Sequence, residues 1–209
     1  MPIKNREAPA GAINALRDGL QHAMGNNAPA ARALAAPPAM MMARASPGAP
    51  RTVENEAAAP HPVYTVDPLA IADGVLLEAA VPTGWRSLIL QGDDAVAAGT
   101  VVESHGKLEF SALNEGRLVG LTVESLTAAE AAFEDEHKDF ELRYLEIRPL
   151  HFSAVWLHSE DEDFILPLED SQDADIAAHS LQPESTILEM LQAEQAIGST
   201  FPELPEEDR

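Results

Sequence analysis

The chain has no cysteine among its 209 residues. Disulfides, thiolate zinc sites, iron–sulfur clusters and cysteine nucleophiles are therefore excluded. No apolar run approaches the roughly 18–20 residues that a membrane-spanning helix needs. The first residues also lack the charged start and continuous apolar stretch of a secretory signal. We therefore expect a cytoplasmic protein with no membrane span.

Positive charge is scarce and unevenly placed. Lys and Arg number 13 against 35 Asp and Glu, for a formal net charge of −22. Residues 1–60 hold six of the basic and four of the acidic groups, so this part is slightly basic and the remainder carries the acidic excess. Such a charge repels nucleic acid phosphates. It also speeds encounter with a basic partner. We expect a protein partner, with a basic one favoured, and no direct binding of nucleic acid.

The first sixty residues contain no aromatic side chain, and the ten aromatics of the chain begin at Tyr64. A packed core needs large side chains to offset the entropy of ordering the chain. The early part offers mainly alanine and proline, a composition typical of disorder. The sequence therefore predicts a largely disordered arm over 1–62, one acidic domain over 63–197 and an acidic tail over 198–209.

Two short segments outside the predicted domain carry candidate partner-binding residues. In the arm, apolar residues recur at spacings of three, four and four, which predicts an amphipathic helix over about 11–24. Three interpretations of this helix stay open: a docking peptide on a tether, an organelle transit segment, or a chance pattern in a disordered chain. In the tail, two apolar residues lie in a proline-stiffened acidic segment typical of a linear motif, with a plain overhang as the alternative. The candidates are Ile13, Leu16, Leu20, Met24, Phe201 and Leu204.

The sequence of the predicted domain indicates mainly strands. Asn114–Gly116 between two apolar runs predicts a hairpin turn. The capping box Thr127–Glu130 predicts the start of a short helix that runs to about 136. A second helix is expected after Pro183, over 184–197. Strands in adjacent pairs with few helices predict an α+β fold, a single antiparallel-sheet domain with one or two short helices. The expected strands are 74–81, 85–90, 100–103, 107–113, 117–125, 140–147, 152–158 and 164–168.

No catalytic, metal-binding or cofactor-binding residue is predicted. His151 and His158 are seven residues apart on one expected strand, so they would point to opposite faces. The acidic run 160–163 lacks the central glycine of a calcium loop. Nucleophile-elbow, phosphate-loop and dinucleotide motifs are absent from the sequence.

The leading hypothesis is a non-enzymatic protein-interaction or adaptor protein, with a tethered N-terminal docking helix and an acidic folded domain. On this hypothesis, deleting residues 1–60 leaves the melting of the remainder nearly unchanged. One alternative is an acidic mimic of nucleic acid that inhibits a basic partner, which requires two rows of carboxylates on one face. Another is a hydrolase or metal enzyme in which carboxylates assist histidines drawn from His105, His137, His151 and His158.

Overall fold

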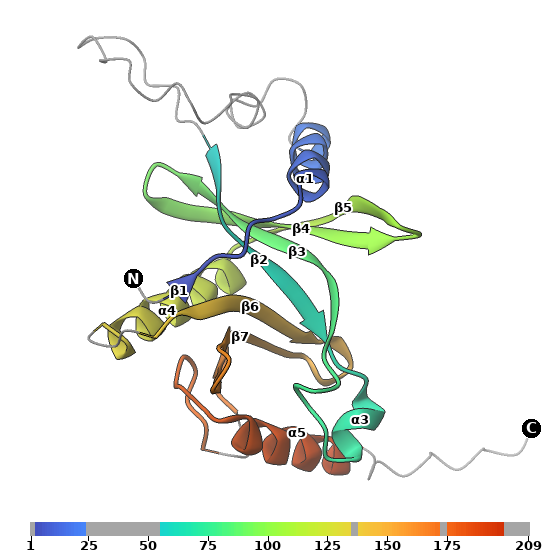
Figure 1. Cartoon of the computed structure of the whole chain (residues 1–209), viewed down its shortest axis with the longest axis vertical. Helices are drawn as coiled ribbons and strands as arrows, with labels where there is room; N and C mark the ends of the chain where they lie inside the picture. The colour runs from blue at the N-terminus through green and yellow to red at the C-terminus, as the bar shows by residue number, and fades with distance from the viewer. Residues whose placement is uncertain (1–2, 24–54, 135–137, 172–174, 199–209) are drawn as a thin grey trace, which may run out of the picture.

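The computed structural model describes residues 3–23, 55–134, 138–171 and 175–198. These residues build one sheet of eight strands in the order β5-β4-β3-β2-β6-β7-β8, with β1 paired to β6 (Figure 1). Neighbouring strands are antiparallel, except that β1 and β2 each run parallel to β6. The predicted α+β class with a mainly antiparallel sheet is confirmed.

The elements have the following bounds. The strands are β1 (Ile3–Lys4), β2 (Asn55–Thr65), β3 (Val81–Gln91), β4 (Asp94–Ser104), β5 (Lys107–Glu115), β6 (Phe140–Ile147), β7 (Phe152–His158) and β8 (Asp163–Pro167). The helices are α1 (Ala10–Ala23), α3 (Pro68–Ala72), α4 (Arg117–Ala132) and α5 (Glu184–Gly198), and η2 (Arg148–Leu150) is a 3-10 turn. The described ranges thus hold more helix than the one or two short helices expected.

Helix α4 replaces both the strand expected over 117–125 and the helix expected from 127. Its buried positions Val119, Thr122, Ser125 and Ala129 follow helical spacing, but two of them are polar. The helical period of apolar residues is therefore hidden. The Thr127 hydroxyl donates to the Val123 carbonyl at 2.9 Å, one turn back, so Thr127 lies inside the helix and caps nothing.

The strand expected over 74–81 is also wrong. Pro68 opens α3, and Asp67 caps it, because its carboxylate accepts from the Leu69 amide at 2.9 Å. Gly74, with a φ of +85°, then turns the chain. An irregular segment follows, and β3 begins only at Val81. The apolar run alone predicts a strand, but Asp67 and Pro68 start a short helix before it, and the chain then turns at Gly74.

Helices cover both faces of the sheet. Helix α4 packs on one face, where Val119 meets Leu88 and Ala98 of the neighbouring strands. The pairing register places Tyr64 and Ile89 on the opposite face. There, α5 and α3 cover the half of the sheet that holds Tyr64, and α1 covers the half that holds Ile89. The domain core therefore has several layers, and residues from both ends of the described chain contribute to it.

Helix α1 is one of these layers. Leu16 and Leu20 are 4% and 1% exposed and lie against β4 and β5. The helix thus matches the predicted span closely, but its apolar face is covered by its own chain. The sheet also starts earlier than expected, since β2 begins at Asn55, inside the segment assigned to the arm.

The contact between α1 and β5 requires a residue without a side chain, Gly19, at the point of closest approach. A Cβ at Gly19 would lie 1.9 Å from Cγ of Phe110, which real atoms do not tolerate. In an exposed helix, replacing glycine by alanine stabilises by about 1 kcal/mol. We expect Gly19→Ala to do the opposite here, because α1 must move away from Phe110. Urea unfolding measures the change.

Gly11→Ala is the matched control on the same helix, since its Cβ would lie an ordinary 3.4 Å from Cδ1 of Leu108. It should be neutral or stabilising. If Gly19→Ala stabilised the protein as much as Gly11→Ala, the described packing of α1 would be wrong.

Candidate functional site

A groove lies at one end of the sheet, where β6 passes through η2 into β7. Two adjoining cavities of about 520 and 500 Å³ form it, and both are lined by Leu150, His151 and Glu194. We call this surface the end groove. Each cavity has the size of a typical ligand pocket. Its walls come from α3, α4, α5, η2 and the strand ends beside them, so distant parts of the chain build it.

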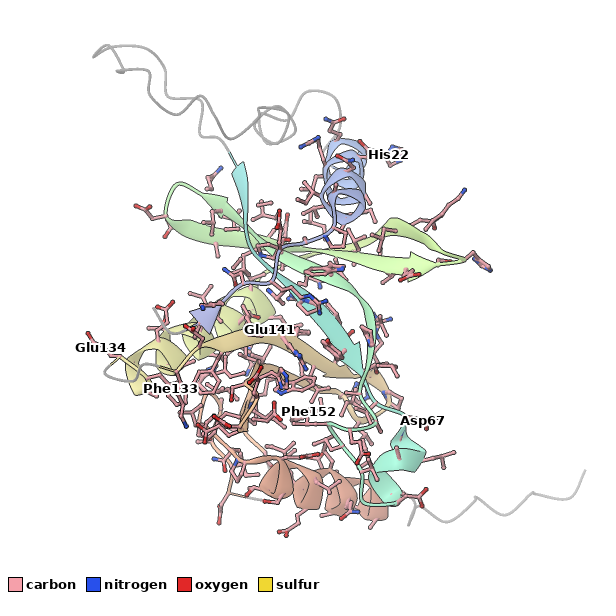
Figure 2. All side chains as sticks on the ribbon, in the orientation of Figure 1. His22, Asp67, Phe133, Glu134, Glu141 and Phe152 are labelled. Carbon is pink, nitrogen blue, oxygen red and sulfur yellow. The ribbon has the colours of Figure 1, made fainter. Side chains whose placement is uncertain are left out.

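Hydrogen bonds fix the walls of the end groove. Asp67, labelled in Figure 2 beside α3, caps that helix. Two amides of α5 donate to α3, from Gln192 Nε2 to the Ile71 carbonyl and from Gln195 Nε2 to the Pro68 carbonyl, both at 2.9 Å. His151 has a φ of 51° and ends the turn η2. The two helices are therefore joined, and His151 is one of the residues that line both cavities.

The end groove combines negative charge with apolar surface. Its acidic lining residues are Glu146, Glu169, Asp170 and Glu194, and Arg148 is its one basic lining residue in the described chain. Arg148 Nε lies 3.1 Å from a carboxylate oxygen of Glu146, and Arg117 lies 3.0 Å from Glu169. Both arginines are largely exposed, and such surface pairs contribute little stability. The groove therefore keeps a net negative charge that a basic ligand can neutralise.

Exposed apolar side chains lie at two places in this groove. Leu69 is 74% exposed and lines the cavity beside α3, with Pro68, Ala72 and Pro149. Leu118 is 38% exposed and lines the other cavity. Large aliphatic side chains exposed in a concave surface mark interaction sites more often than scattered ones do.

A third cavity, of about 400 Å³ and separate from the end groove, is lined in part by an oriented histidine. His158 Nδ1 lies 2.7 Å from Oδ1 of Asp163, which also accepts from Trp156 Nε1 at 2.7 Å. The carboxylate fixes the Nδ1–H form of the ring, as in general-base pairs. The nearby Ser159 hydroxyl donates to the Glu162 carbonyl, so it is already engaged. His158 is the one histidine that lines this cavity among the described residues, and no group of ligands for a metal occurs in the same ranges.

A serine, a histidine and a carboxylate meet elsewhere, but in a closed arrangement. Ser125 Oγ lies 2.7 Å from Nδ1 of His179, and Nε2 of that ring lies 3.1 Å from Glu124. Ser125 is fully buried, so a substrate has no path to its oxygen. The set instead ties α4 to the segment after β8, where the His179 amide donates to the Pro167 carbonyl. Ser125 and His179 are 54 positions apart, and no sequence motif predicts that they pair.

A buried polar cluster lies between the central strands. His61 and Arg86 are 1% and 3% exposed, and the Arg86 guanidinium lies 4.5 Å from the ring centroid of Tyr144. Burial lowers the pKa of His61 to about 4; the bond to the Ala59 carbonyl opposes this shift, and the charge of Arg86 adds to it. The Nδ1–H of His61 donates to that carbonyl at 2.6 Å, and because the pKa is lowered to about 4 the ring is neutral at pH 7. Neither His61 nor Arg86 lines the end groove or the cavity beside His158.

The residues predicted from sequence do not gather at one site. Leu16 and Leu20 are buried between α1 and the sheet, whereas Ile13 on the same helix is 43% exposed. Met24, Phe201 and Leu204, like His137, lie outside the described residues. His105 lies in the turn between β4 and β5, and His151 and His158 line separate cavities. His151 also precedes β7, so the expectation that both histidines share a strand is wrong.

The chain matches no family model, no curated protein and no solved structure. Within the described ranges, no helix is both long and apolar enough to cross a membrane. Function is therefore inferred from the sites above and their chemistry.

Proposed function

We propose that this protein is a non-enzymatic interaction protein of the cytoplasm, and that its end groove binds a basic segment of a partner protein. The observation that carries the proposal is the coincidence of exposed Leu69 and Leu118 with four carboxylates in one concave surface. The apolar part supplies burial on binding, and the carboxylates supply selectivity and fast encounter with a basic chain.

This proposal moves the interaction surface away from α1. A docking helix must present its apolar face, but Leu16 and Leu20 already contact β4 and β5. Binding through that face would require α1 to leave the sheet and expose both surfaces to water. The end groove can bind without any such rearrangement.

The alternatives fit the geometry less well. A mimic of nucleic acid presents rows of charge, whereas the end groove places its acids beside an apolar part that contains Leu69, Pro149 and Leu150. A hydrolase needs a nucleophile or an activated water beside its base. His158 has an orienting carboxylate, but the hydroxyl nearest to it in sequence, that of Ser159, is bound within its own turn.

The test compares capture of a partner by three forms of the tagged full chain. The wild type should retain a basic partner from cell extract, and Glu146→Lys/Glu169→Lys should lose it, because charge in the groove is reversed. Glu103→Lys/Glu109→Lys makes the same change of charge on β4 and β5 and should retain the partner. Thermal melting of all three forms checks that each is folded.

Loss of capture by the β4 and β5 variant as well would mean that only net charge matters. Retention by the groove variant would place the interface elsewhere. Either result contradicts the proposal.

A further inference from the structure

The end groove has two chemically different halves. The α3 half, with Leu69, Pro149 and Ala72, has a single acidic residue, Glu194, which lies at the border. The other half contains Glu146, Glu169 and Asp170. Resting on the proposed function, we infer that the ligand is a two-part peptide segment, with an aliphatic or aromatic anchor in the α3 half and arginine or lysine in the acidic half.

The α3 half is built to receive an anchor. Leu69 is the most exposed large hydrophobic residue in the described chain. It lies on a helix that α5 holds through Gln192 and Gln195, and Pro149 stiffens the opposite wall. A rigid apolar surface loses little entropy when a side chain packs on it. Most of the free energy gained by burying the anchor therefore contributes to binding.

The acidic half is built to receive a cation. Arg148 is its only basic lining residue in the described ranges, and its side chain is 72% exposed. An exposed pair such as Arg148–Glu146 is easily exchanged for a pair with an incoming arginine. Guanidinium groups suit such a site, because they form two parallel hydrogen bonds with a carboxylate.

The connection between the halves favours a peptide over a small cation. In the described chain, the residues that line both cavities are Leu150, His151 and Glu194, so a ligand that occupies both must pass the border that these three form. A polyamine satisfies the acidic half but brings no anchor for Leu69. A peptide brings both groups on one backbone, and linking two weak contacts raises the overall affinity.

Fluorescence anisotropy of labelled nine-residue peptides on the full chain tests the inference. The first probe carries a leucine-isoleucine pair at one end and three arginines at the other, and a second carries the reverse order. A third replaces the apolar pair by alanines, and a fourth replaces the arginines by glutamates. We expect the better of the first two to bind at least about tenfold more tightly than the third and the fourth.

Two variants test which half of the groove is responsible for the affinity gained from the apolar pair and which for the affinity gained from the arginines. Leu69→Ser should remove the advantage of the anchored probe over the alanine probe, and leave the alanine probe unchanged. Glu146→Lys/Glu169→Lys should remove the advantage of arginine over glutamate. If the basic probes bind equally with or without the anchor, or if spermidine displaces the anchored probe as well as an unlabelled copy does, this inference is overturned and the proposed function stands. If no basic probe binds at all, both fail.

Discussion

Replacing Leu20 by alanine is expected to lower the free energy of unfolding by about 3 kcal/mol. The side chain is 1% exposed and lies in the cluster that α1 forms with β4 and β5. Truncation removes apolar contacts and leaves a cavity that the rigid sheet cannot fill. For a domain of this size, the melting temperature should fall by roughly 6–12 °C.

Ile13→Ala is the control for this prediction. Ile13 lies on the same helix and shares the predicted apolar face, but it is 43% exposed. Its truncation should cost less than about 1 kcal/mol. Urea unfolding of the two variants and the wild type gives both values. Equal small losses would show that α1 does not pack on the sheet in solution.

The same packing changes what deletion of the N-terminal segment should do. Composition alone predicted that residues 1–60 can be removed without consequence for the rest. The structure instead gives this segment the strand β1, the helix α1 and the start of β2. Deletion therefore uncovers Ile89 and Val101 of the sheet and should destabilise the remainder.

The second large effect is a dependence of stability on pH through His61. Its pKa is lowered from 6.5 to about 4 in the folded protein. Between these two values the unfolded chain binds the proton and the folded chain does not, so stability falls as pH falls. The contribution of His61 is complete above pH 6.5 and is lost towards pH 4, by about 3 kcal/mol in total.

His61→Gln isolates this contribution from the many carboxylates that titrate in the same range. Glutamine keeps a donor for the Ala59 carbonyl but does not titrate. The difference in unfolding free energy between wild type and variant should therefore shift by about 3 kcal/mol from pH 7 to pH 4. A difference that stays constant with pH would mean that His61 is solvated rather than buried.

The sequence predicted the second half of the fold better than the first. Strands β6, β7 and β8 are short, largely apolar runs separated by turns, and Pro183 indicates the start of α5, so these four elements lie within one or two residues of expectation. The sequence did not predict the full length of helix α4, because the polar residues Thr122 and Ser125 occupy two of its buried positions. Their polar groups are satisfied by the Leu118 carbonyl and by His179, which only tertiary structure reveals.

The candidate site could not be predicted for a related reason. Leu69, Glu169 and Glu194 are ordinary residues in their local sequence, and they lie on α3, in the segment after β8 and on α5. No spacing rule connects them, because the sheet and two helices bring them together. The composition did indicate a basic partner, but the place where such a partner binds required the groove.

Hydrogen exchange of the full chain, free and bound to the anchored arginine probe, tests the central claim most directly. We predict that α1 exchanges slowly in the free protein, and that bound probe slows exchange at α3 and in the η2 turn up to His151, with α1 unchanged. Rapid exchange of α1 in the free protein, or new protection that falls on α1 rather than on the end groove, would contradict the account.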